Sequence, residues 1–159
     1  MKIAYLGLGS NLGDRKANLQ DAITRLAGDS VRVLRESSIW ETEPRDMLDQ
    51  PWFLNQVIEV ESDLLPRQLF QRIQRVEREM GRQRRIPKGP RLIDIDILLY
   101  GNAVVKTDDL EIPHPRLADR RFVLEPLAEL APDLRHPVAR KTVRELLAEV
   151  AGQSARKSK

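Results

Sequence analysis

Two aspartates lie two residues apart in the apolar segment 92–99, which reads Leu-Ile-Asp-Ile-Asp-Ile-Leu-Leu. Because side chains alternate along a β-strand, Asp94 and Asp96 should share one face, with Cα atoms about 6.5 to 7 Å apart. The other face would carry Ile93, Ile95, Ile97 and Leu99. Two carboxylates at this distance repel by roughly 2 kcal/mol at an effective dielectric constant of ~20, so a cation is their expected partner.

Mg²⁺ is the cation that best fits such a pair, because it prefers carboxylate oxygens, keeps several waters and shares its coordination with substrate phosphates. Two Mg²⁺ ions bridged by the pair would suit phosphoryl transfer. The alternation alone leaves a second interpretation open, since any amphipathic strand can have a polar face that happens to be acidic.

A basic cluster precedes this segment and favours the metal interpretation. It consists of Arg82, Arg84, Arg85, Lys88 and Arg91. Guanidinium groups bind phosphate oxygens in a bidentate fork and stay charged at any relevant pH. Phosphoryl transfer depends mostly on positioning and charge stabilisation, and cations for phosphate beside carboxylates for metal supply both. We therefore favour a phosphoryl-transfer site over a solvated basic loop.

Other polar positions give weaker signals. Gln74 and Glu77 lie on the helix expected to begin near Pro66, and Glu77 borders its apolar stripe, where a carboxylate more often reaches water than binds a ligand. His114 stands between two prolines and Arg120 follows, so both could contact phosphate. A lone loop histidine is nevertheless usually only solvated.

Phe53 and Phe122 are two of only three phenylalanines, and each has a polar neighbour, Asn55 and Arg121 respectively. A flat heterocycle could stack between the two rings, although core packing is the default for a single Phe. The glycine pattern Gly-x-Gly-x-x-x-Gly at 7–13 matches neither the dinucleotide fingerprint nor the phosphate loop, so we interpret it as a structural strand-to-helix turn.

The composition restricts the class of protein. The chain has 159 residues, 41% of them hydrophobic and 32% charged, which predicts one globular domain. No apolar run approaches the roughly 20 residues of a membrane helix and the start does not resemble a signal peptide, so we expect a cytoplasmic protein. Without cysteine and with two histidines, any metal must be held mainly by oxygen. The net charge of +3 favours an anionic partner.

The periodicity of the chain predicts the elements that position these residues. β-Branched and apolar runs predict strands at 3–8, 31–41, 52–61 and 92–99, and a short strand after the Gly101-Asn102 turn. Apolar residues three and four apart predict helices around 19–26, 66–81, 120–130 and 141–150. This order favours a ferredoxin-like α+β sandwich, a mostly antiparallel sheet carrying helices, over a doubly wound parallel sheet. We assign residues 1–152 to this single domain and predict a disordered basic tail at 153–159.

Four ordered motifs resemble the 6-hydroxymethyl-7,8-dihydropterin pyrophosphokinases of folate biosynthesis, over the chain from the first strand to about residue 135. They are Gly9-Ser10-Asn11-Leu12-Gly13, Gln50-Pro51 with Phe53-Leu54-Asn55, Gly89-Pro90-Arg91 leading into Asp94-Ile95-Asp96, and Pro113-His114-Pro115 with Arg120, Phe122 and Pro126-Leu127. The resemblance implies a ferredoxin-like fold and the transfer of diphosphate from ATP to the hydroxymethyl group of a reduced pterin, with release of AMP.

The resemblance also implies a role for each candidate residue. The metal ligands of two Mg²⁺ ions would be Asp94 and Asp96. The pterin would be held by Thr42, Phe53, Asn55 and Phe122. ATP would contact Gln74, Glu77, Arg82, Arg91, Ile97, His114 and Arg120, and the catalytic arginines would be Arg82, Arg84 and Arg91.

Two positions depart from the family pattern. Many members carry Arg-Trp directly before Gly-Pro-Arg, whereas this chain reads Ile86-Pro87-Lys88 and the loop is one residue shorter than in some members. Lys88 is a point charge that cannot replace the lid an indole provides. Position 115 is proline where some members have tyrosine.

Two other classes compete with a pyrophosphokinase that acts as a monomer on small molecules. An RNA-binding ferredoxin-like module would suit the pI of about 9.4. Against it, the chain is only 4% aromatic and the polar strand face is acidic, so we expect no nucleic-acid partner. A non-catalytic regulatory domain that binds nucleotide is the third interpretation.

Overall fold

The protein is built around an antiparallel sheet. The structure is a computed structural model that describes residues 1–43, 49–81, 92–153 and 156–158. Within these ranges, the strands follow the order β5-β1-β4-β3-β8, and β2 also pairs with β4. Their bounds are β1 Lys2–Ser10, β2 Val31–Glu36, β3 Trp40–Thr42, β4 Phe53–Ser62, β5 Asp94–Tyr100 and β8 Arg156–Lys157. All pairs are antiparallel, so the predicted mostly antiparallel sheet is confirmed.

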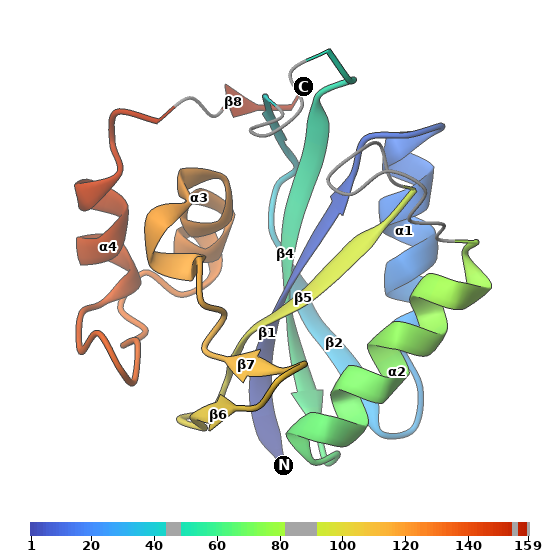
Figure 1. Cartoon of the computed structure of the whole chain (residues 1–159), viewed down its shortest axis with the longest axis horizontal. Coiled ribbons are helices and arrows are strands. Elements are labelled where there is room, and N and C mark those ends of the chain that lie inside the picture. Colours follow the sequence, from blue (N-terminus) through green and yellow to red (C-terminus); the bar gives the residue numbers. More distant parts are fainter. Residues whose placement is uncertain (44–48, 82–91, 154–155, 159) are drawn as a thin grey trace.

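Helices cover both faces of this sheet (Figure 1). One face packs against α1 (Arg15–Leu26) and α2 (Pro66–Glu79), whose buried apolar residues recur three and four positions apart, as expected for these helices. The other face packs against the 3₁₀ turn Leu117–Asp119, α3 (Arg121–Leu130) and α4 (Val143–Glu149). This is the ferredoxin-like α+β architecture expected from the order of the elements. No described helix combines the length and the apolar character that crossing a membrane requires.

The strand predicted at 31–41 is wrong, because the structure has two strands there. β2 pairs with the second half of β4 and β3 with its first three residues. Between them, the Ser37 hydroxyl accepts the backbone N–H of Val57, and the Gln56 side chain donates to the Ser37 carbonyl. The Ser37 backbone N–H still donates to the Val57 carbonyl at 2.9 Å, and the two side-chain bonds are added to this last backbone bond where β2 ends.

The alternation predicted for β5 is also wrong at Leu99. Ile93, Ile95 and Ile97 pack toward α1 and α2 as expected, but Leu99 lies in the core on the α3 side. The register with β1 shifts between the pairs Leu6–Ile97 and Tyr5–Leu99, which leaves Leu98 as an extra residue. A β-bulge of this kind reverses the facing of every later side chain.

Two side chains of the sheet hold α3 in place. Arg35 of β2 donates to Glu59 and to the Leu130 carbonyl at the end of α3, at 2.8 and 2.7 Å. The indole N–H of Trp40 in β3 donates to the Glu129 carboxylate at 2.6 Å. Because both bonds come from strands, the position of α3 over this face is determined by polar contacts as well as by apolar packing.

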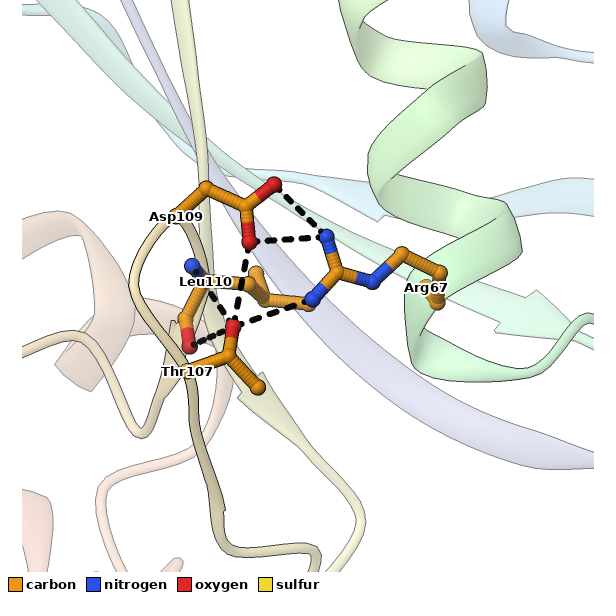
Figure 2. Close-up of polar contacts among 4 residues, drawn as sticks. All are labelled: Arg67, Thr107, Asp109 and Leu110. Atoms are coloured by element: carbon orange, nitrogen blue, oxygen red, sulfur yellow. Dashed lines mark hydrogen bonds and ion pairs between the residues drawn. The ribbon is translucent and has the colours of Figure 1, made fainter.

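A small hairpin, β6 (Val105–Lys106) with β7 (Glu111–Ile112), follows β5 and is tied to the start of α2. Figure 2 shows the contact: Arg67 donates to both carboxylate oxygens of Asp109 at 2.8 Å and to the Thr107 hydroxyl at 2.9 Å. The Arg67 guanidinium lowers the pKa of Asp109. The hairpin leads directly into the segment that carries His114.

The C-terminal segment contacts the start of α3 and then pairs with strand β3. The Gln153 side chain accepts the backbone N–H of Arg121 at 2.9 Å and donates to the Asp119 carbonyl at 2.6 Å. Beyond it, Lys157 pairs with Trp40 in the short strand β8. The single domain at 1–152 and the disorder of the tail in solution stay predictions.

Candidate functional site

Two rows of residues cross the sheet on the face that α3 partly covers. The first row runs from Asn55 in β4 through Gly9 in β1 to Asp94 in β5. The second, two residues further along, joins Val57, Gly7 and Asp96. Residues in one row point to the same side of the sheet. The two aspartates therefore share a face with Asn55, with only glycine between Asp94 and Asn55.

The acidic pair is accessible from this face. The Asp96 side chain is 53% exposed, and Asp94 is half-buried. Since Ile93, Ile95 and Ile97 are buried on the opposite face, the predicted division of this part of the strand into a wet side and an apolar side is confirmed. The geometry thus keeps two carboxylates together without burying either of them completely.

His114 lies next to this pair. Its Nε2 is 3.8 Å from the Asp96 Oδ2, and its Nδ1 accepts the backbone N–H of Arg116 at 3.1 Å. An Nδ1 that accepts a hydrogen bond places the proton of the neutral ring on Nε2, toward Asp96. Burial lowers the pKa of His114, and the positive charges of Arg120 and Arg116 lower it further, while Asp96 acts in the opposite direction. The ring is therefore a neutral donor at pH 7.

The outer edge of β5 faces α2 and the His114 segment. The buried Glu77 of α2 accepts the backbone N–H of Ile95 at 3.0 Å. The His114 backbone N–H donates to the Leu98 carbonyl at 3.0 Å. The Ile97 side chain is in the core, but alternation directs its backbone groups to the same edge as the N–H of Ile95. Gln74, one turn before Glu77, is half-buried.

Polar and aromatic side chains surround the other end of the first row. Asn55 donates through its Nδ2 to the hydroxyl of the buried Thr42 at 2.6 Å. Phe53, the register partner of Thr42, is two residues from Asn55 and so lies on the same face. A Cβ at Gly9 would come within 3.1 Å of the Asn55 Oδ1 and 3.6 Å of the Phe53 ring, so glycine leaves room for both side chains.

Phe122 and Arg120 approach from the helical layer over this face. Phe122 is the second residue of α3, and the Arg120 guanidinium carbon is 5.4 Å from the centre of its ring. An arginine over an aromatic ring at this distance makes a cation–π contact. The structure thus brings a phenylalanine and a cation to the side of the sheet that carries Phe53 and the aspartates.

Most of the predicted site residues that the structure describes converge here. Arg82, Arg84 and Arg91 fall in 82–91, outside the described residues. The side chains of Ile97 and Glu77 lie on the α2 side of β5, so only the edge of that strand connects them with the aspartates. Sequence reasoning missed Asn11 and Arg15, which contact the segments next to Thr42 and Phe53. The sequence did contain a sign that Arg15 has a role outside its helix, because a cation is unfavourable at a helix start.

The donor set suits Mg²⁺ better than zinc. Its members are carboxylate oxygens on an accessible strand face, and the chain has no cysteine. In the part of the chain that the structure describes, no three His, Asp or Glu side chains gather as a metal site. Two protein carboxylates are enough for Mg²⁺ when waters and phosphate oxygens complete the octahedron. The residues present therefore fit this ion.

The fold and the site define a class: a ferredoxin-like α+β domain whose sheet carries an accessible acidic pair on the same face as an amide and an aromatic side chain. The family model described as 7,8-dihydro-6-hydroxymethylpterin-pyrophosphokinase (HPPK) matches residues 5–132. The chain belongs to this family. This confirms the resemblance seen in the motifs.

Curated relatives and a solved structure agree with this membership. The chain is 42% identical over 149 residues to the 2-amino-4-hydroxy-6-hydroxymethyldihydropteridine pyrophosphokinase of Aquifex aeolicus, covering 94% of this chain and 92% of that protein. It is 45% identical over 156 residues to the folic acid synthesis protein fol1 of Schizosaccharomyces pombe, covering 98% of this chain and 21% of that protein. The crystal structure of Plasmodium falciparum HPPK-DHPS superposes with a TM-score of 0.75 at 16% identity, over 95% of this chain and 43% of that one.

Two of these comparisons have a limited reach. The chain spans only about a fifth of the fol1 proteins, 21% in S. pombe and 18% in Pneumocystis carinii. The Plasmodium structure, at 16% identity, shows the fold alone.

Proposed function

We propose that this protein transfers a diphosphate group from ATP to the hydroxymethyl group of 6-hydroxymethyl-7,8-dihydropterin in folate biosynthesis and releases AMP. The observation that carries the proposal is the row Asn55–Gly9–Asp94. Two strand spacings separate the Cα atoms of Asn55 and Asp94 by about 10 Å. A pterin bound at one end of the row would therefore have its substituent near phosphates bound at the other.

The pterin site in this proposal consists of Thr42, Phe53, Asn55 and Phe122. A flat ring would stack on the phenylalanines, and the amide of Asn55 would hydrogen-bond its polar edge. Thr42 supports this role because its hydroxyl accepts one Asn55 N–H and so limits how the amide can turn. Asn55 would then present its remaining polar atoms to the ligand.

The nucleotide site would follow the outer edge of β5. The backbone of Ile97 would offer its N–H and C=O to the base, beside Gln74 and Glu77. His114 and Arg120 would contact the phosphates, and Nε2 of the neutral His114 would donate. The catalytic cations would be Arg82, Arg84 and Arg91 of the segment 82–91. Their assignment rests only on the resemblance to the family.

Asp94 and Asp96 would hold two Mg²⁺ ions. When bound, these ions neutralise phosphate charge and align the triphosphate. The reaction is an in-line displacement: the pterin hydroxymethyl oxygen forms a bond to the β-phosphorus and releases its proton to solvent, the bond from that phosphorus to the oxygen bridging to the α-phosphate breaks, and AMP leaves with that oxygen. Asn55 and the phenylalanines orient the nucleophile, and the arginines stabilise charge on the transferred group.

The test is a reaction of the protein with MgATP and hydroxymethyl-dihydropterin, followed by chromatography of the nucleotides. We expect AMP in a one-to-one ratio with pterin diphosphate. Formation of ADP, or no turnover, would refute the proposal. Titration calorimetry of a non-hydrolysable ATP analogue with and without Mg²⁺, and then of pterin, separates the proposal from a regulatory domain, which would bind nucleotide without Mg²⁺ dependence.

The RNA-binding interpretation is not favoured by the family membership. Salt-sensitive RNA binding that ATP does not affect would revive it. A monomeric state, a cytoplasmic location and the absence of a nucleic-acid partner stay predictions.

A further inference from the structure

Arg15 joins the two strands of the proposed pterin site at their ends. Its Nη1 donates to the Glu41 carboxylate at 3.0 Å and to the Trp52 carbonyl at 2.8 Å. Glu41 directly precedes Thr42 in β3, and Trp52 directly precedes Phe53 in β4. Thr42 and Phe53 are register partners, so a single guanidinium holds both neighbours of that pair.

Helix formation does not explain this arginine. Arg15 is the first residue of α1, where the helix dipole disfavours a positive charge, and the first turn has no acidic residue. Asp14 already caps the helix by accepting the Ala17 N–H at 3.2 Å. The Arg15 and Glu41 side chains are only 30% and 20% exposed, so their ion pair is partly shielded from water. The polar contacts of Arg15 are therefore made with the two strand ends and not with its own helix.

Asn11, which lies between β1 and α1, makes contacts that reinforce those of Arg15. The Asn11 side chain donates to the Gln50 side chain at 2.8 Å and to the Pro51 carbonyl at 3.1 Å. Asn11 and Gln50 are both buried. Asn11 and Arg15 together therefore hold the three consecutive residues 50 to 52, directly before β4, through side chains that lie outside the proposed pterin contacts.

We propose that Arg15 is a positioning residue for pterin binding, acting by holding the end of β3 against the start of β4. This inference rests on the proposed function. Thr42 sets the orientation of Asn55, and Phe53 supplies a stacking face, so a change in the spacing of the two strand ends moves both ligand contacts together. Among the described residues, no hydrogen bond or ion pair joins Arg15 to β5, the nucleotide side of the row, so we expect ATP binding to be unaffected.

The experiment compares Arg15→Met with Arg15→Lys and Arg25→Met by steady-state kinetics and thermal unfolding. Arg25→Met is the matched control, since Arg25 lies on the same helix and pairs with Asp21 and Glu79, at 3.0 and 3.6 Å. We expect Arg15→Met to raise the KM for pterin about tenfold and to leave the KM for ATP within about twofold. Arg15→Lys keeps a cation that can donate to both acceptors and should recover most of the loss. Arg25→Met should change neither KM.

Glu41→Gln provides a second route, because it keeps the shape and one acceptor oxygen but removes the ion pair. It should raise the KM for pterin in the same direction and by a smaller factor. Equal changes in both KM values, or none, in an active enzyme would overturn the positioning role alone. A wild-type protein that forms no AMP would overturn the proposed function and this inference with it.

Discussion

Glu77 accepts the backbone N–H of Ile95, the residue between Asp94 and Asp96, at 3.0 Å. Ile95 lies in β5, which pairs only with β1 in the main sheet as described, so this N–H points away from the ladder. A buried N–H without an acceptor costs about 1 to 3 kcal/mol. Glu77 thus satisfies the edge of the strand at the centre of the acidic pair, which explains why a carboxylate interrupts the buried side of α2.

Replacing Glu77 with leucine should therefore weaken nucleotide binding through the strand. Glu77→Leu leaves the Ile95 N–H unpaired and frees the strand edge, so we expect the Kd for the Mg²⁺ complex of an ATP analogue to rise about tenfold. Glu77→Gln keeps an acceptor oxygen and should stay within about threefold. Titration calorimetry measures both values. Equal losses in the two variants would mean that the charge of Glu77, and not its hydrogen bond, is what matters.

Asp96→Ala should abolish turnover and leave the fold intact. The Asp96 side chain is 53% exposed and faces away from the core formed by Ile95 and Ile97. We expect AMP formation to fall by at least about a hundredfold, as on loss of a major charge-stabilising group. Stability should change by no more than about 0.5 kcal/mol in urea unfolding, as for other surface substitutions. Asp108→Ala, at another exposed aspartate, is the control and should be fully active. Substantial turnover in Asp96→Ala would remove the basis for the metal site.

Periodicity predicted those parts of the site that depend on a single element. The two-residue spacing of Asp94 and Asp96 is enough to put them on one face, because alternation is a local property of a strand. The bulge at Leu98 could not be predicted, since Leu98 and Leu99 are both apolar and either could face the core. The facing of the residues after the bulge depends on the pairing with β1, which lies more than 90 positions earlier in the chain.

Contacts between elements could not be predicted from the sequence for a similar reason. Spacing places Glu77 at the border of the α2 stripe, but only the sheet order shows that the edge of β5 needs an acceptor there. The glycine-rich turn looked purely structural, and its Asn11 and the following Arg15 contact residues about 25 to 40 positions away. Side chains that act across elements leave no periodic trace in the chain.

Thr42→Val should impair pterin binding selectively. Valine keeps the shape of the buried threonine but removes the oxygen that accepts the Asn55 N–H at 2.6 Å. Asn55 would lose its fixed orientation, and we expect the KM for pterin to rise about tenfold while the KM for ATP stays constant. Thr24→Val on the exposed side of α1, where the hydroxyl donates to the Gln20 carbonyl, is the matched control. A parallel rise in both KM values would indicate general damage to the fold.

His136 should make stability depend on pH. Its Nδ1 accepts the N–H groups of Val138 and Ala139 at 3.2 and 3.0 Å, and burial lowers its pKa from the ordinary 6.5. On acidification the unfolded chain takes up the proton first. The free energy of unfolding therefore has its full value above about pH 6.5 and falls below it until the folded-state pKa is passed, by at most about 1.4 kcal/mol per pH unit.

His136→Asn isolates this contribution, because asparagine offers a similar acceptor and does not titrate. Urea unfolding at pH 7.5 and pH 5.0 should show a smaller loss of stability in the variant than in the wild type. His114, whose pKa is also lowered, contributes equally to both proteins and cancels in the comparison. Identical pH dependence in the two proteins would contradict the assignment.

Gly9→Ala tests whether the middle of the row must be empty. The new Cβ would lie 3.1 Å from the Asn55 Oδ1 and 3.6 Å from the Phe53 ring, closer to the amide oxygen than side chains normally pack. Asn55 must then turn or shift, and its bond to Thr42 resists both movements. We expect pterin affinity to fall about tenfold or more, since a small displacement of a positioning group is costly. MgATP affinity should be unchanged, because the three atoms nearest to the new Cβ belong to Asn55, Phe53 and Leu54 and none to an aspartate. Gly152→Ala, where a Cβ meets nothing within 4 Å, is the control, and normal pterin affinity in Gly9→Ala would show that the ligand does not depend on this end of the row.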